Sequence, residues 1–141
     1  MIDRKNWKEE VLVRFSKKPV WRGVDCDEGW KSLICRLVDA LDRTKVPYRI
    51  VQVKEKFGGL RFYLEEGPLR LDLLGPGRRV SMTGKPRKNA EIFKLISRAE
   101  TRSFTICETC GKPGKPRKGV WIKTLCLRCH RARRKAEAAG R

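Results

Sequence analysis

The chain has 141 residues, enough for one modest hydrophobic core and a small satellite unit that needs a metal to fold. Its 35 Lys and Arg against 16 Asp and Glu residues give a formal net charge of +19, which indicates a polyanionic partner, nucleic acid first of all. The absence of a membrane-spanning run and of a signal-peptide pattern predicts a cytoplasmic protein, and the single histidine, His130, weighs against many classes of enzyme.

Two amphipathic helices are predicted in the first third of the chain. One covers residues 3–17, with Asp3 as its N-terminal cap. The other follows the cap residue Asp27 and ends near Arg43, before Pro47. The apolar face of the second helix consists of Trp30, Leu33, Ile34, Leu37, Val38 and Leu41.

A β-hairpin is predicted next, because alternating residues from Tyr48 onward flank the turn dipeptide Gly58-Gly59. The apolar face of the hairpin should pack against the helices. Glu55 also lies on that face and is interpreted as structural. The predicted pairs on this face are Phe57 with Leu60, Glu55 with Phe62, and Val53 with Leu64.

The opposite face of this hairpin carries three cations and an aromatic ring. Lys56 is predicted to lie opposite Arg61, and Lys54 opposite Tyr63. Like charges in direct register destabilise a sheet, so the pattern suits a surface that meets phosphate. The alternative is a solvated face.

The segment from residue 66 to 89 is rich in Gly, Pro and basic residues and is interpreted as a linker or basic loop. A third helix is expected over residues 90–102, capped by Asn89, with its apolar residues facing the core. These boundaries divide the chain into a helix-helix-hairpin unit (1–65), the linker (66–89) and a C-terminal unit (90–141). The core-facing residues of the third helix are Ile92, Phe93, Ile96 and Ala99.

Two Cys-x2-Cys pairs separated by fifteen residues form the clearest motif in the chain. This spacing is typical of one structural zinc ion bound by four thiolates, here Cys107, Cys110, Cys126 and Cys129. Cys26 and Cys35 stand apart from the motif; Cys26 is interpreted as a loop thiol and Cys35 as a small residue of the core or its flank.

The cysteine unit should contain short strands and a final helix that are rich in basic residues. We expect Phe104 and Ile106 to enter a strand, Val120–Lys123 to form another, and the helix to start at the second cysteine pair, as in treble-clef units. His130 is interpreted as a neighbour of the metal site, a phosphate contact or an inert residue. The predicted phosphate-binding residues here are Lys112, Lys115, Arg117, Lys118, Arg128, Arg131, Arg133, Arg134 and Lys135.

Several of these motifs together resemble a set of small zinc-binding proteins of bacteria, phages and prophages. The resemblance rests on Gly29-Trp30, VKEKFGGLRFY (53–63), Ala99-Glu100 before Ser103, and CETCGKPG with VWIKTLC (107–126). It implies a phage or bacterial setting and no particular activity.

The cysteine motifs CETCG and LCLRCH also resemble the zinc-stabilised frame of HNH endonucleases. Those enzymes need a histidine on the strand between the cysteine pairs to activate water beside a divalent cation. The corresponding stretch here is Val120–Lys123, which has none, so a degenerate nuclease is the less favoured interpretation.

We therefore expect an α+β protein in which helices pack on a β-hairpin, followed by a treble-clef-like zinc unit. The expected function is non-enzymatic binding of DNA or RNA, in the role of a phage or prophage regulator. Tyr63 and Trp121 are candidates for base stacking if single strands are bound. The alternative is a phage factor that docks on a host protein complex that processes nucleic acid.

Overall fold

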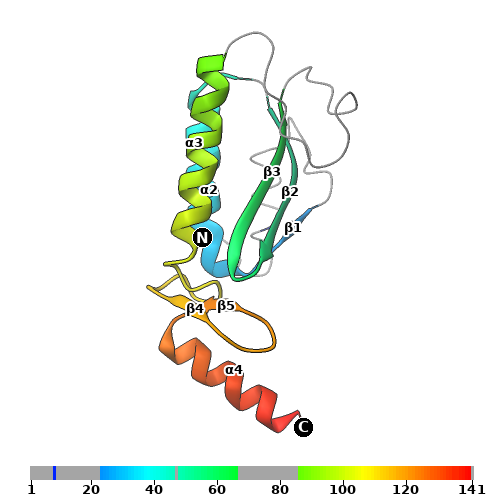
Figure 1. Ribbon diagram of the computed structural model, residues 1–141, viewed down its shortest axis with the longest axis vertical. Coiled ribbons are helices and arrows are strands. Elements are labelled where there is room, and N and C mark those ends of the chain that lie inside the picture. Colours follow the sequence, from blue (N-terminus) through cyan, green and yellow to red (C-terminus); the bar gives the residue numbers. More distant parts are fainter. Residues whose placement is uncertain (1–7, 9–22, 47, 67–85, 141) are drawn as a thin grey trace.

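The computed structural model describes residues 8, 23–46, 48–66 and 86–140. Figure 1 shows helices α2 and α3 side by side over one face of a β-sheet, with a smaller unit and a last helix continuing from one end of that layer. The predicted α+β class is confirmed. The elements are β1 (Val24–Asp25), η1 (Glu28–Trp30), α2 (Lys31–Arg43), β2 (Tyr48–Lys56), β3 (Gly59–Glu66), α3 (Pro86–Ser103), β4 (Lys115–Arg117), β5 (Lys123–Leu125) and α4 (Leu127–Ala139).

Two predicted segments fall largely outside these residues. The expected helix over residues 3–17 is described only at Lys8, which is helical. The expected linker over 66–89 is described only at its two ends. Among the described residues, no helix is both long and apolar enough to cross a membrane.

The second predicted helix forms as η1 followed by α2 and ends at Arg43, as expected. Every residue of its predicted apolar face is buried. Asp27 occupies the N-cap position of η1, as predicted, but its side chain makes no capping hydrogen bond. The Asp27 carboxylate instead lies 3.5 Å from Lys123 Nζ, so a long-range ion pair takes the place of the local cap.

The hairpin forms, but its predicted register is wrong. The turn residues are Phe57 and Gly58, both with positive φ, and Val53 lies opposite Phe62. Gly59 belongs to β3 and packs against the ring of Phe104. A Cβ added at this position would lie 2.3 Å from the ring, so the contact requires glycine here. Near the turn the shift is two residues, which preserves the side-chain faces, so Val53 and Phe62 still point to the core. A β-bulge between Ile50 and Gln52 brings Tyr48 and Ile50 to the core as well.

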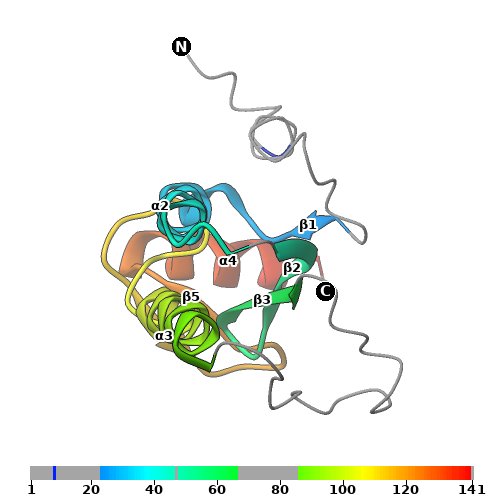
Figure 2. The same cartoon turned by 90° about the horizontal axis from the view of Figure 1, so that it is seen from above.

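The sheet has the order β1-β2-β3, with β1 parallel and β3 antiparallel to β2. Figure 2, seen along the helices, places α2 and α3 on the same side of these strands. The hydrophobic core lies between the two layers and includes Trp30, Ile34, Leu41, Ile50, Val53, Leu60, Phe62 and Ile92.

Helix α3 begins at Pro86 rather than at the predicted residue 90, and Asn89 lies inside it. Proline suits the first helical turn because its φ is already helical and no N–H is needed there. Ile92, Ile96 and Ala99 are buried as predicted, whereas Phe93 is half-buried. The expected division of the chain groups this helix with the cysteine unit, yet its packing partners are α2 and β3.

The strands of the cysteine unit differ from those predicted. Phe104 lies in a turn and Ile106 makes a single bridge with Pro113, so residues 104–106 form no strand that leads into the first cysteine pair. Strand β4 forms within the run of basic residues from Lys112 to Lys118, and β5 covers Lys123–Leu125 instead of residues 120–123. The physical reason is burial: Thr124 and Leu125 are buried against the rest of the fold, while Val120 is fully exposed.

Candidate metal centre and basic surface

The four cysteines of the predicted metal site meet at one point. The sulfur atoms of Cys107, Cys110, Cys126 and Cys129 all lie within 4.8 Å of one another. A zinc ion with four thiolates at about 2.3 Å separates its sulfurs by roughly 3.8 Å. The Cys110 and Cys126 sulfurs are 3.7 Å apart. The cluster therefore has the size needed to hold one tetrahedral metal ion.

Backbone hydrogen bonds shape the first half of this cluster into a tight turn. Cys107 donates its N–H to the carbonyl of Lys112 at 2.7 Å, and Gly111 donates to the carbonyl of Cys107 at 2.9 Å. Gly111 has φ of 80°, a left-handed conformation that glycine adopts without a Cβ clash. This turn orients both sulfurs of the first pair toward the same point.

The second half of the cluster lies at the N-terminus of α4. Cys126 is the N-cap residue, and its sulfur accepts a hydrogen bond from the N–H of Cys129 at 3.4 Å. This bond lowers the pKa of Cys126 to about 7, whereas loss of solvation raises the pKa values of Cys110 and Cys129. The fold thus favours the thiolate of Cys126, whereas a bound cation would favour the thiolates of Cys110 and Cys129.

Cys26 and Cys35 take no part in the cluster. Cys26 is buried in the core, and burial, followed by the nearby Glu108 charge, raises its pKa to about 12. Cys35 is half-buried against the same core. Among the described residues, no other group of three or more Cys, His, Asp or Glu side chains is placed to share an ion.

A buried carboxylate, Glu108, joins the cluster to the α/β layer. Its side chain is 1% exposed and accepts a hydrogen bond from the N–H of Asp27 at 3.3 Å. Lys123 Nζ lies 3.4 Å from the Glu108 carboxylate. Burial raises the pKa of Glu108, and the nearby ammonium charge offsets part of that rise. Nothing in the sequence indicated this role, because a Glu between two cysteines of a loop is ordinarily exposed. Its burial depends on contacts with residues that are distant in the sequence.

A second connection lies at the tip of the β2-β3 hairpin. Thr124 donates its hydroxyl to the carbonyl of Gly58 at 2.6 Å, and Trp121 donates its indole N–H to Glu55 Oε2 at 3.1 Å. The other Glu55 oxygen accepts the N–H of Gly58 at 2.8 Å. Glu55 is therefore structural, and the cysteine unit is packed on the hairpin rather than joined only by the chain.

The predicted phosphate-binding residues of the hairpin share its outer face, in a different pairing from that expected. Lys54 lies opposite Arg61, and Gln52 opposite Tyr63. Lys54 Nζ lies 5.6 Å from the centre of the Tyr63 ring. Arg61 is engaged by Glu100, whose Oε2 lies 3.4 Å from the guanidinium, so part of its charge is already balanced.

The basic residues of the cysteine unit are mostly exposed. Lys112, Lys115 and Lys118 are exposed around β4, whereas Arg117 donates to the carbonyl of Leu125 at 3.1 Å. On α4, Arg133 contacts Glu137 at 2.9 Å and the carbonyl of Trp121 at 3.0 Å. The exposed cations of α4 are Arg128, Arg131, Arg134 and Lys135.

Helix α4 extends away from the rest of the molecule and buries none of its own residues (Figure 1). His130 in its first turn is half-buried, and its Nδ1 has no hydrogen-bond partner among the described residues. Loss of solvation, followed by the charges of Arg117 and Arg134, lowers the pKa of His130. Its neighbourhood is thus mainly cationic, with Glu137 as a nearby carboxylate of opposite effect.

Comparisons with protein-family models, with curated proteins and with solved structures found no match to this chain. We therefore infer its function from the geometry of the site.

Proposed function

We propose that this chain is a non-enzymatic, zinc-stabilised nucleic-acid-binding protein. The observation that carries the proposal is helix α4, which exposes a row of cations, buries no residue and begins at the cysteine cluster. A polar helix of this kind gains little from core burial, so helix-favouring residues and the anchor at its N-terminus must stabilise it, and its exposed surface is free for a partner.

Zinc is the proposed metal. Four thiolates in a tetrahedral cluster suit it, and they leave no open position for substrate, so the ion is structural. The order of the unit supports this assignment: a cysteine turn, the β4-β5 hairpin, and a helix that starts at the second cysteine pair. That order is typical of treble-clef zinc units.

The charge distribution supports a polyanionic ligand. Residues 109–136 carry Lys or Arg at ten positions and no Asp or Glu. The exposed members of this set would contact phosphates, and each contact would release bound counterions. The proposed setting, a phage or prophage regulator in the bacterial cytoplasm, rests on the resemblance described above.

We assign no catalytic role to the unit. A nuclease with an HNH-type frame would need a histidine between the cysteine pairs, and residues 111–125 contain none. A cleavage assay with magnesium or manganese tests this assignment. Cleavage that is lost in His130→Ala would contradict it.

The test of binding is a fluorescence anisotropy titration of labelled DNA and RNA across a range of salt concentrations. The triple variant Arg128→Ala/Arg131→Ala/Arg134→Ala should bind all of them more weakly and reduce the salt slope by about 1 for each phosphate contact removed. The control Arg36→Ala/Arg43→Ala/Arg98→Ala removes the same charge from exposed positions on α2 and α3. Equal losses in both variants, or no binding at low salt, would contradict the proposal.

A second candidate, docking on a host protein, is favoured by a groove between α2 and α3. Its lining includes apolar Leu33, Leu37 and Leu95, with the cations Arg36 and Arg98. An acidic amphipathic segment would match this combination. In a pull-down from nuclease-treated lysate, a stoichiometric partner lost in Arg36→Glu/Arg98→Glu, but kept in the α4 triple variant, would favour docking over nucleic acid.

A further inference from the structure

The turn of the β2-β3 hairpin contains an unusual residue. Phe57 has φ of 52° and is 68% exposed, although glycine or asparagine is the favoured residue for a turn of this kind. The fold thus places a bulky aromatic ring in a strained conformation and gains little burial from it. Strain of this kind is often kept where the side chain has a function outside the fold.

A second exposed apolar segment lies in the β4-β5 loop. Val120, Trp121 and Ile122 are 104%, 57% and 37% exposed. Trp121 is nevertheless held in place, since its indole N–H bonds to Glu55 at 3.1 Å and its carbonyl accepts from Arg133 at 3.0 Å. The edge of the indole is anchored while much of the ring stays open to solvent.

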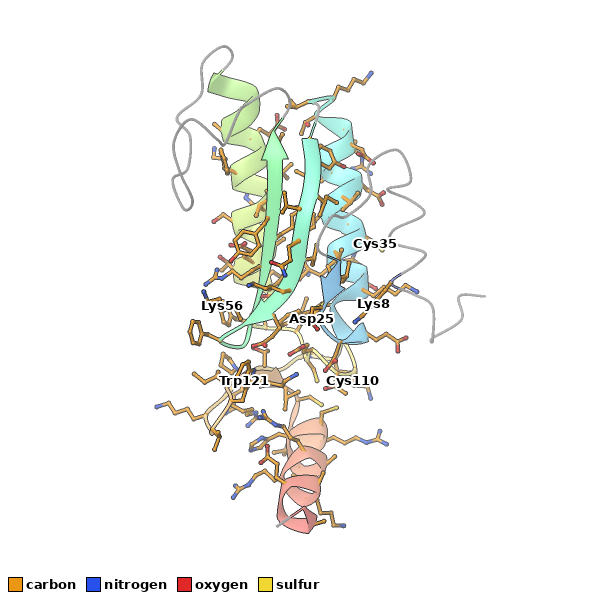
Figure 3. All side chains as sticks on the ribbon, turned by 90° about the vertical axis from the view of Figure 1, so that its right-hand side faces the viewer. Lys8, Asp25, Cys35, Lys56, Cys110 and Trp121 are labelled. Carbon is orange, nitrogen blue, oxygen red and sulfur yellow. The ribbon has the colours of Figure 1, made fainter. Side chains whose placement is uncertain are left out.

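The two segments lie against each other. A Cβ on Gly58, next to Phe57, would lie 3.0 Å from Ile122 Cγ2. Figure 3 shows Lys56 and Trp121 on the same side of the molecule, where the hairpin tip meets the β4-β5 loop. Lys56 Nζ lies 5.6 Å from the Phe57 ring. Phe57, Trp121 and Lys56 therefore lie around the junction of the two segments, and the bond from Arg133 to the Trp121 carbonyl links this junction to α4.

We propose that Phe57 and Trp121 form a stacking platform for unpaired bases, so that the preferred ligand is single-stranded nucleic acid. This inference rests on the proposed function, in which α4 and the exposed lysines around β4 hold the phosphates. Unpaired bases stack readily on exposed aromatic rings, whereas bases inside a duplex already stack on one another. The anchored indole loses little freedom on binding, which favours this use of an exposed ring.

The test compares an oligothymidylate with a duplex of the same length by fluorescence anisotropy, using the metal-loaded full chain. Trp121→Ala and Phe57→Asn should each weaken single-strand binding by about tenfold, the effect of losing one stacked base. Duplex affinity, which depends on phosphate contacts, should change by less than about twofold. The matched control is Leu127→Ala, which removes an exposed apolar side chain from α4.

Two variants separate stacking from a structural role. Phe57→Asn should keep or raise the melting temperature, because asparagine before glycine is favoured in this turn. Trp121→Phe should retain most single-strand affinity, because it keeps a ring but loses the bond to Glu55. If Trp121→Phe is as weak as Trp121→Ala, the hydrogen bond matters rather than the ring and the platform is overturned.

The remaining outcomes distinguish this inference from the function it rests on. Unchanged single-strand affinity in Trp121→Ala and Phe57→Asn, together with weak binding by the α4 triple variant, overturns the platform and leaves the proposed function standing. Absence of binding to either probe by the unaltered protein overturns both. Equal loss of single-strand and duplex affinity in the platform variants also overturns the preference for unpaired bases.

Discussion

Gly29 and Glu108 are in backbone contact across the junction between the α/β layer and the cysteine unit. The N–H of Gly29 donates to the carbonyl of Glu108 at 2.7 Å. The next residue, Trp30, donates its indole N–H to the carbonyl of Ile106 at 2.9 Å. Consecutive residues at the start of the η1-α2 segment thus hold the backbone on both sides of Cys107, one of the four clustered cysteines.

Gly29→Ala should disrupt this junction. An added Cβ would lie 2.1 Å from the carbonyl oxygen of Cys107, and backbone cannot move aside as a flexible side chain can. We expect a loss of about 3 kcal/mol in the free energy of unfolding, measured by urea denaturation. Gly119→Ala is the control, because its nearest neighbour would be 3.8 Å away, and it should change stability by less than about 0.5 kcal/mol.

Ser103→Ala should cost more than an ordinary loss of one hydroxyl. The buried Ser103 side chain accepts the N–H of Leu60 at 2.8 Å and donates to the carbonyl of Glu100. Its removal leaves the strand N–H buried without a partner, which costs about 1–3 kcal/mol. Thr105→Ala is the matched control: that exposed hydroxyl bonds only to the carbonyl of Arg102, at 2.7 Å. Equal thermal shifts for the two variants would contradict the prediction.

Metal removal should release both the first cysteine turn and α4. Structural zinc sites supply about 10 kcal/mol of binding free energy that is also folding free energy. We therefore expect one zinc per chain by elemental analysis, its loss in Cys110→Ser, and reduced helical circular dichroism after chelation. Cys35→Ala should keep the metal, because that thiol lies outside the cluster. A full equivalent of zinc in Cys110→Ser would contradict the assignment.

Stability should fall at alkaline pH through Tyr48. Burial raises the pKa of Tyr48 above its ordinary value, and its hydrogen bond to Asp42 raises it further. The folded chain therefore holds the proton more tightly than the unfolded chain. The stabilising contribution is complete below about pH 10 and is lost as pH rises above that value.

Denaturation at a series of alkaline pH values checks this dependence. In Tyr48→Phe, the free energy of unfolding should decrease less as the pH rises above about 10. In Tyr63→Phe, it should decrease as much as in the unaltered protein. Tyr63 is the other tyrosine of the chain and lies on the exposed face of the hairpin. An unchanged pH dependence in Tyr48→Phe would contradict the prediction.

The β2-β3 hairpin shows which features of a strand pair can be predicted from the local sequence pattern and which cannot. Counting from the turn assigned Val53, Leu60 and Phe62 to the buried face, because that assignment depends only on odd and even positions. It did not indicate the β-bulge between Ile50 and Gln52, which brings Tyr48 and Ile50 to the core as well. The register depends on where the turn forms, and two glycines in succession offered two choices. Phe104 selects one of them by packing on Gly59, and this contact joins residues 45 positions apart.

The residues that carry the family resemblance also make contacts that the sequence pattern does not predict. Gly29-Trp30, the FGGLRF segment and Ser103 look unrelated along the chain, yet each lies at a contact between the α/β layer and the segment leading to the cysteines. Their spacing carries no periodicity that would indicate a shared junction. Packing alone brings them together.

The sequence by itself determined the α+β class, the apolar faces of α2 and α3, and the four cysteines of the metal cluster. These features depend on periodicity and on the spacing of chemically distinctive residues, which act over a few positions. Only the tertiary structure decided the hairpin register, the buried Glu108 that joins the two units, and the neighbouring positions of Phe57 and Trp121. These depend on contacts between distant segments, where burial and packing override local preference.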